Sequence, residues 1–151
     1  MDEFSKRLAA AKIIGLDTSV FIYFLENNPR YGSLAQISLN GIEKGTWEGV
    51  TSTITLMEIT VRPWQLENEM AAREYETVLV HFPNLSIVDV DRNVARAAAQ
   101  LRAKYKVSPP DALQVAASIS FGAQAFLTND KRLSKLDELI DVIVMDDFLN
   151  E

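Results

Sequence analysis

Residues 13–26, IIGLDTSVFIYFLE, decide the fold of this 151-residue chain. An apolar run of strand length ends at Asp17, and a second apolar run, of helical length, follows it directly. A strand that turns straight into a helix is the repeating unit of α/β proteins with mainly parallel sheets. Parallel strands end at one edge of their sheet, where sites form. We therefore expect Asp17 at that edge.

The rest of the chain repeats the alternation of strands and helices. We predict strands at residues 12–16, 50–52, 85–90, 123–127 and 142–145, and helices at 18–26, 32–44, 53–63, 67–81, 91–105, 108–120 and 131–139. Because domains cluster at about 100–150 residues, a single domain over residues 1–151 is expected. The predicted fold is α/β, with a mainly parallel sheet of about five strands between helices.

The side-chain inventory excludes several kinds of site. The chain has no cysteine, which removes disulfides, thiolate zinc sites and cysteine nucleophiles. His81 is its one histidine, so histidine-rich metal sites are excluded as well. A Ser-His-Asp triad would need His81, and no G-x-S-x-G motif supports one. We predict His81 at a helix end or on the surface.

Charge and the first residues indicate the compartment and the range of partners. A formal charge of −6 opposes broad adhesion to nucleic acid or an anionic membrane, and leaves any contact with an anionic partner to local cations such as Arg62, Lys131 and Arg132. Residues 1–17, MDEFSKRLAAAKIIGLD, place acids before bases and contain only a short apolar stretch. We therefore expect neither a secretory signal nor a membrane-spanning helix, and a cytoplasmic protein.

Four acids, each set beside an apolar segment, are the candidate functional residues: Asp17, Glu58, Asp111 and Asp130. Carboxylates brought together near apolar surroundings repel one another unless a cation pairs with them. Their hard oxygens suit Mg²⁺ or Mn²⁺, and such an ion can activate water and neutralise charge on a phosphodiester. The set therefore predicts a metal site for hydrolysis, with one or two ions.

Each acid alone also has an ordinary structural explanation. Asp17 can cap the following helix, Asp111 can complete a capping box, and Asp130 can begin a turn. Glu58 can pair with Arg62 one helical turn later. The alternative function is thus a non-catalytic α/β protein-binding module whose acids cap helices. Metal binding discriminates the two, because a carboxylate site is stabilised by Mg²⁺ or Mn²⁺ and scattered caps are not.

Taken in order, four segments resemble the PIN-domain ribonucleases and, within them, the VapC-type toxins of toxin–antitoxin pairs. The segments are LDTSVFIYFLE with Asp17, TLMEI with Glu58, PDALQVAAS with Asp111 and FLTND with Asp130. The resemblance covers nearly the whole chain and implies that these acids bind Mg²⁺ or Mn²⁺. It also implies Thr18, Ser19, Thr128 and Asn129 as hydrogen-bonding neighbours of ligands, water or phosphate.

The same resemblance implies an activity and its partners. It implies an endoribonuclease that cleaves single-stranded or loop RNA, forms a homodimer and is inhibited by a small antitoxin protein. Two other enzyme classes fit less well. A phospho-aspartate hydrolase of the haloacid dehalogenase type needs a second Asp at the position of Ser19, and the G-x-x-x-x-G-K-[ST] motif of nucleotide binding is missing.

Overall fold

A five-stranded parallel sheet forms the centre of the computed structural model, which describes residues 2–149. The strands are β1 (Ile13–Leu16), β2 (Glu48–Ser52), β3 (Leu85–Val88), β4 (Ala125–Thr128) and β5 (Asp141–Val144). Their order in the sheet is β3-β2-β1-β4-β5, and every pair of neighbours is parallel. The predicted α/β fold with a parallel sheet of five strands is confirmed.

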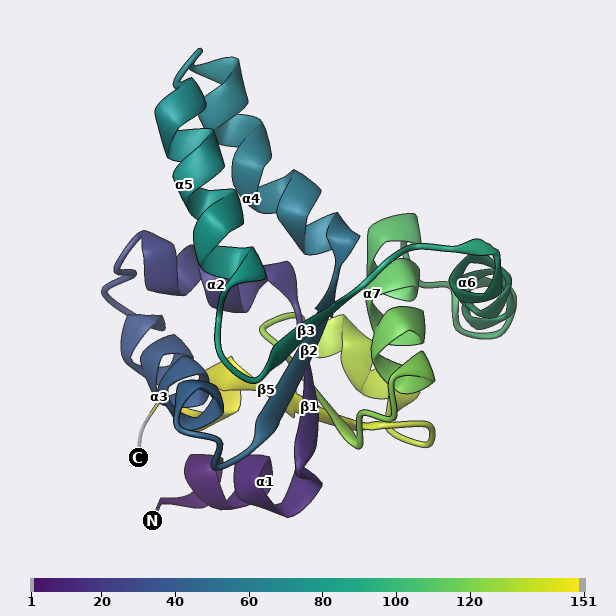
Figure 1. The fold of residues 1–151 in the computed structure, drawn as a ribbon. Helices are drawn as coiled ribbons and strands as arrows, with labels where there is room; N and C mark the ends of the chain where they lie inside the picture. Colours follow the sequence, from purple (N-terminus) through teal and green to yellow (C-terminus); the bar gives the residue numbers. More distant parts are fainter. Residues whose placement is uncertain (1, 150–151) are drawn as a thin grey trace.

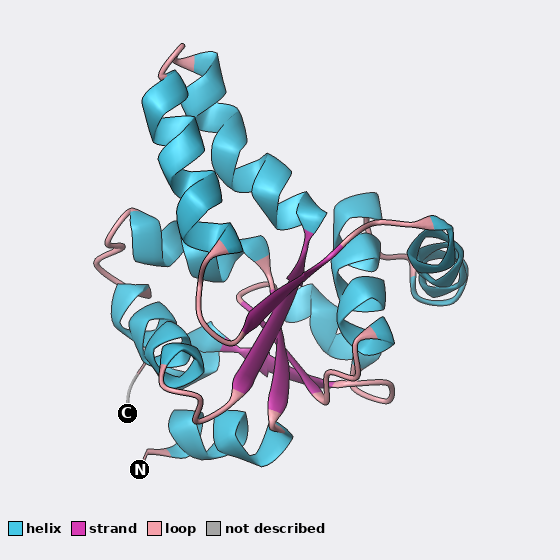
Figure 2. Cartoon of the chain, in the orientation of Figure 1, coloured by secondary structure: helices cyan, strands magenta, loops and turns pink. Residues whose placement is uncertain are grey.

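Helices cover both faces of the sheet (Figures 1 and 2). They are α1 (Glu3–Ala11), α2 (Thr18–Leu25), α3 (Gly32–Glu43), α4 (Thr53–Gln65), α5 (Glu69–Val80), α6 (Arg92–Tyr105) and α7 (Pro109–Ser120), with 3₁₀ helices η1 (Lys131–Leu136) and η2 (Met145–Phe148). One face packs on α1, α2 and α3, and the other packs on α6, α7 and η1. The α4–α5 pair projects from the body as a helical hairpin (Figure 1).

Alternation along each strand divides the core between the two faces. In β4, Leu127 belongs to the cluster under α1 to α3, whereas Phe126 belongs to the cluster under α6 and α7. In β1 the position facing α7 is Gly15, where a Cβ atom would lie 2.3 Å from Ser118 Oγ. The missing side chain lets α7 pack close against β1, which brings the first turns of α7 to the carboxyl end of the sheet.

The element boundaries differ from the prediction where local signals were weak. Helix α1 was not predicted, because its buried residues Phe4, Leu8 and Ala11 are spaced among charged ones in a short segment. Residues 131–139 were predicted as one helix, but η1 ends at Leu136 and has 3₁₀ geometry. The Ser52 side chain caps α4 by accepting a hydrogen bond from the Ile54 amide, at the predicted start of this helix.

Helix α4 continues through Pro63, where the prediction ended it. A proline in a helix costs one backbone hydrogen bond and crowds the carbonyl four residues earlier. Here α5 packs along α4, and Pro63 is buried in the hairpin, so tertiary packing outweighs the local cost. The two extra residues, Trp64 and Gln65, lengthen α4 within the projecting hairpin. The remaining predicted strands and helices are present with ends shifted by a few residues.

Candidate functional site

Asp17 follows the last residue of β1 and lies at the carboxyl edge of the sheet. Its backbone amide extends the sheet by donating to the Leu127 carbonyl over 3.0 Å. Its carboxylate accepts two hydrogen bonds, from the Thr18 amide to Oδ1 at 2.8 Å and from Thr128 Oγ1 to Oδ2 at 2.6 Å. Asp17 therefore caps α2, as its ordinary explanation predicts, while being tied to β4 as well.

The surroundings of Asp17 are unfavourable to its negative charge. Burial, together with the nearby charges of Asp111 and Glu58, raises the pKa of Asp17 to about 6, although hydrogen bonds from Thr128 and Thr18 oppose the rise. A carboxylate that only caps a helix is stabilised as an anion, and its pKa falls. The raised pKa therefore identifies three carboxylates, Asp17, Glu58 and Asp111, within electrostatic reach of one another.

Glu58 is held toward this group from α4. Its Oε1 atom accepts a hydrogen bond of 2.6 Å from Thr18 Oγ1, on the residue after Asp17. The alternative ion pair between Glu58 and Arg62 does not occur among the ion pairs of residues 2–149. The ordinary explanation of Glu58 is therefore wrong. Its carboxylate bridges α4 to the start of α2.

A buried network of polar side chains sets the direction of the hydrogen bond between Thr18 and Glu58. Gln114 Nε2 donates to Thr18 Oγ1 at 2.9 Å and to Thr55 Oγ1 at 2.8 Å, which uses both amide hydrogens. Its Oε1 atom accepts from Ser52 Oγ at 2.6 Å. The single Thr18 hydroxyl hydrogen is then free to point at Glu58. Gln114 thus orients Thr18 as a donor to the site.

The same network joins β1 to β2 and α4. Thr51 Oγ1 donates to the Leu16 carbonyl at 3.0 Å and lies 2.8 Å from Thr55 Oγ1, so Thr55 donates to Thr51. All of these hydroxyl and amide groups are buried and hydrogen-bonded. Since unpaired buried polar groups are costly, the network fixes the relative positions of β1, α4 and α7 beneath the acids.

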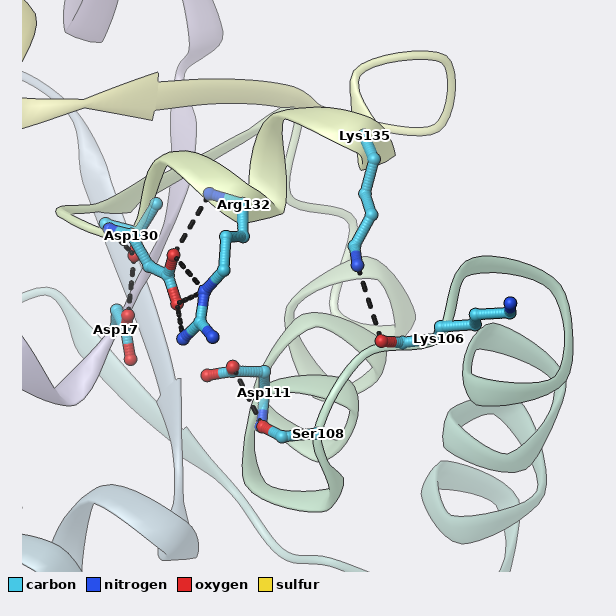
Figure 3. A network of polar contacts seen from close by, with 8 residues as sticks. Asp17, Lys106, Ser108, Asp111, Asp130, Arg132 and Lys135 are labelled. Carbon is cyan, nitrogen blue, oxygen red and sulfur yellow. Dashed lines mark hydrogen bonds and ion pairs between the residues drawn. The ribbon is translucent and has the colours of Figure 1, made fainter.

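Asp111 lies in the first turn of α7, where Ser108 is the N-cap, and it forms one of the two bonds of the predicted capping box. Ser108 Oγ accepts from the Asp111 amide at 3.4 Å and donates to Asp111 Oδ2 at 2.9 Å. Figure 3 shows the Asp111 carboxylate directed toward Asp17 and toward the paired side chains of Asp130 and Arg132. The capping role and proximity to Asp17 therefore coexist at this residue.

Asp130 is joined to the site through Thr128 and neutralised by Arg132. Thr128 Oγ1 accepts from the Asp130 amide at 3.1 Å while donating to Asp17. The Asp130 carboxylate receives hydrogen bonds from Arg132 Nε at 3.0 Å and from the terminal nitrogen at 2.8 Å (Figure 3). These bonds hold the pKa of Asp130 below its ordinary value, and the Arg132 charge also interacts with Asp111.

Thr18 and Thr128 thus hydrogen-bond directly to the acids. The side chains of Ser19 and Asn129, the other two predicted neighbours, do not. The Ser19 hydroxyl is buried and has no hydrogen-bond partner among the described residues. Asn129 uses its amide elsewhere: it donates to the Tyr23 hydroxyl at 3.1 Å and accepts from the Asp146 amide at 2.9 Å. Asn129 therefore braces the end of β4.

Sequence reasoning missed Gln114 and the hydroxyls of residues 51–55. The available signal was polar side chains at positions that the helical pattern makes buried, since Gln114 stands among apolar residues of LQVAAS. His81 was placed correctly: it is exposed and ends α5.

The residues at this edge fit a divalent cation in chemistry. Asp17 carries a charge that its neighbours disfavour, and only oxygen ligands surround it, which suits Mg²⁺ or Mn²⁺. In residues 2–149, no group of three or more His, Asp or Glu side chains is already arranged to hold an ion. The pairing of Asp130 with Arg132 is one reason, because it engages both carboxylate oxygens. The metal set stays a prediction.

Comparison of the fold with solved structures finds toxin–antitoxin complexes. A chain of VapBC2 from Rickettsia felis, solved bound to a DNA fragment from its promoter, matches with a TM-score of 0.68 and 16% identity, over 87% of this chain and 98% of that one. DNA-bound VapBC from Salmonella typhimurium matches with a TM-score of 0.61 and 24% identity, over 89% of this chain and 98% of that one. FitAcB from Neisseria gonorrhoeae matches with a TM-score of 0.63 and 19% identity, over 88% of this chain and 97% of that one. At these identities the likeness shows the fold.

Sequence comparison gives the family. No curated protein matches the sequence. The sequence model of the PIN domain family matches residues 14–139, which include all four candidate acids. The match agrees with the resemblance in LDTSVFIYFLE, TLMEI, PDALQVAAS and FLTND. The chain belongs to the PIN domain family.

Proposed function

We propose that this protein is a metal-dependent endoribonuclease and the toxin of a toxin–antitoxin pair. The observation that carries the nuclease is the half-buried Asp17 carboxylate, whose pKa is raised to about 6 by burial and by Asp111 and Glu58. Family membership supports it, since PIN domains are generally nucleases. In this proposal Asp17, Glu58, Asp111 and Asp130 hold Mg²⁺ or Mn²⁺, which activates water and offsets charge on the phosphodiester.

The side chains around these acids position them for the reaction. Thr18 donates a hydrogen bond to Glu58 and Thr128 donates one to Asp17, which fixes the orientation of both carboxylates. Gln114 supports Thr18 from below. Arg132, exposed over 83% of its side chain, is a cation at the rim that an RNA phosphate can reach in place of Asp130. Cytoplasmic RNA would reach this open edge directly.

The proposed partners are a small antitoxin and a second copy of the chain. The solved complexes with the same fold are described as toxin–antitoxin or VapBC assemblies. The projecting hairpin exposes several large apolar side chains: Met57, Val61, Trp64, Leu66, Met70 and Val78. An unpartnered surface of this kind suits protein docking. None of the helices in the described part has the length and apolar character needed to cross a bilayer.

A non-catalytic binding module remains the second candidate, because two of the acids cap helices and a third bonds to a cap residue. Asp17 accepts from the Thr18 amide, Asp130 accepts from the Arg132 amide, and Asp111 accepts from the Ser108 hydroxyl. Capping alone gives no reason for the charge of Asp17 to be disfavoured by two further acids. The nuclease proposal accounts for both features.

Metal-dependent cleavage of a pool of structured RNAs tests the nuclease directly. The purified chain is incubated with Mg²⁺ or Mn²⁺, or with a chelator, and the ends of the products are sequenced. We expect defined ends that appear only with metal. Absence of cleavage, together with no thermal stabilisation by either ion, would leave the binding module as the better function. Light scattering tests the dimer, and a pull-down from the protein's own host tests the antitoxin.

Divalent metal binding should depend on pH near 6, because Asp17 must be ionised to bind a cation. We expect affinity for Mn²⁺ to fall as the pH drops through about 6, which is well above the ordinary aspartate pKa of 3.8. Calorimetric titration from about pH 3.5 to about pH 8 measures it, because this range covers both the ordinary and the raised pKa of Asp17. A midpoint near 4 would contradict the electrostatic coupling.

Removing the Arg132 side chain should strengthen metal binding. Arg132→Ala frees both oxygens of Asp130 and removes a cation that faces Asp111. We expect Mn²⁺ affinity to rise about fivefold, equivalent to the ~1 kcal/mol of an exposed ion pair. Arg73→Ala is the matched control, because it removes an exposed arginine from an ion pair with Glu69 on α5. Weaker binding in Arg132→Ala than in Arg73→Ala would show that Arg132 does not compete with the ion.

A further inference from the structure

We propose that a groove between α2, α4 and α5 is a subsite for one unpaired base of the RNA. The inference rests on the proposed function and deepens it by assigning a place to the nucleotide beside the cleaved bond. The groove has a volume of about 210 Å³. Its apolar lining includes Ile22, Leu25, Pro63, Leu66 and Tyr75.

Continuity with the acids selects RNA as the occupant. Glu58 lines the groove and, through its hydrogen bond to Thr18, also belongs to the group of carboxylates around Asp17. A phosphodiester at those acids would therefore have the neighbouring base at the mouth of the groove. Arg62 lines the same mouth one helical turn after Glu58, and within residues 2–149 it forms no ion pair. It is a free cation for a phosphate or a base edge.

The dimensions and chemistry fit a base better than a peptide helix. Pockets for drug-sized ligands span about 300–1,000 Å³, so a groove of about 210 Å³ suits a single ring system. Bases stack on aromatic and apolar side chains because every base has an apolar face. The half-buried Tyr75 ring supplies such a surface, while Glu26 and Asn68 at the lining offer polar contacts to a base edge.

Filling the groove tests the subsite. Ala71 lines it from the first turn of α5 and is half-buried, so Ala71→Trp should occupy the space of a base. Met70→Trp is the matched control, because Met70 is 73% exposed and lines a different hollow on the same helix. Thermal unfolding checks that both variants fold. Leu66→Ala, at an exposed residue of the lining, is the second variant should Ala71→Trp fail that check.

Binding is measured on chains that also carry Asp111→Asn, so that RNA stays intact. The probes are short single-stranded RNAs of one base type that carry a single 2-aminopurine, whose fluorescence falls when it stacks. We expect strong quenching at one position only, and about tenfold weaker binding in Ala71→Trp, within the ~1–3 kcal/mol of base stacking. An abasic nucleotide at that position should weaken binding equally and add nothing further in Ala71→Trp.

Several results would overturn the subsite. The first is equal RNA affinity of the Ala71→Trp and Met70→Trp variants, and the second is additive losses of affinity from the abasic nucleotide and from Ala71→Trp. The third is no RNA binding at all by the chain, and the fourth is that Ala71→Trp loses antitoxin binding alone. The last would make the groove a protein-docking site. Position-dependent binding without metal-dependent cleavage by the wild-type chain would instead keep the subsite and refute the nuclease, so the two proposals fail separately.

Discussion

Replacing Asp17 by Asn is expected to abolish metal-dependent RNA cleavage while leaving the metal-free protein at least as stable as the wild type at pH 7. Asn is about as good a helix cap as Asp, because its Oδ1 atom can still accept from the Thr18 amide. Its Nδ2 group takes the place of Oδ2 and donates to Thr128 Oγ1, whose hydroxyl hydrogen then turns away. It lacks the charge that a divalent cation requires. We expect cleavage to fall by at least about a hundredfold, since even outer-shell changes cost about 10–100-fold.

The expected gain in stability follows from the sign of the pKa shift. Because the pKa of Asp17 is raised from 3.8 to about 6 in the folded chain, the folded state binds the proton more tightly than the unfolded state. The stabilisation of the fold by this tighter proton binding is fully present below about pH 4 and is lost as the pH rises through about 6. At pH 7 the ionised group therefore costs the metal-free fold on the order of 3 kcal/mol, by ~1.4 kcal/mol per pKa unit.

Urea unfolding at pH 7 with a chelator, and again with Mn²⁺, measures both effects. The wild type should gain stability from the ion, and Asp17→Asn should not. Asp2→Asn is the matched control, because Asp2 caps α1 by accepting from the Ser5 amide and is exposed. If Asp17→Asn retains cleavage, or unfolds like a variant that has lost a cap, Asp17 is a structural residue.

Gln114→Leu is expected to destabilise the fold by about 3 kcal/mol and to weaken metal binding as well. Leucine has similar bulk but leaves Ser52, Thr18 and Thr55 without the partners that Gln114 provides. Each buried polar group left unpaired costs about 1–3 kcal/mol. The Thr18 hydroxyl also loses the bond that directs its hydrogen to Glu58, so the carboxylate is less well held.

The same Gln→Leu substitution at an exposed residue is the control. It separates the effect of losing the buried hydrogen bonds from the effect of replacing a glutamine by a leucine. Gln100 lies exposed on α6, and Gln100→Leu should alter the free energy of unfolding by less than about 0.5 kcal/mol. Urea unfolding compares the two variants, and calorimetry with Mn²⁺ compares their metal affinity. Equal stability of the two variants would show that the buried network adds little beyond packing.

The sequence by itself determined the units of the fold and the family. The boundary between β1 and α2 could be predicted because IIGL and TSVFIYFL carry local signals on either side of Asp17. Parallel pairing followed from the alternation of elements, because a strand, helix and strand in succession leave few other arrangements. The four acids could be chosen together because each stands beside an apolar segment.

Tertiary structure alone decided how those acids are held. Thr18 is 40 positions from Glu58 and 96 from Gln114, yet it bonds to both, and no local pattern specifies such contacts. Thr128 bonds to Asp17 across 111 positions in the same way. Helix α1 gains its stability by burying Phe4 and Leu8 against β1 and α3, which the isolated segment cannot do. Local propensity fixes elements, whereas burial and hydrogen bonding between distant segments fix the site.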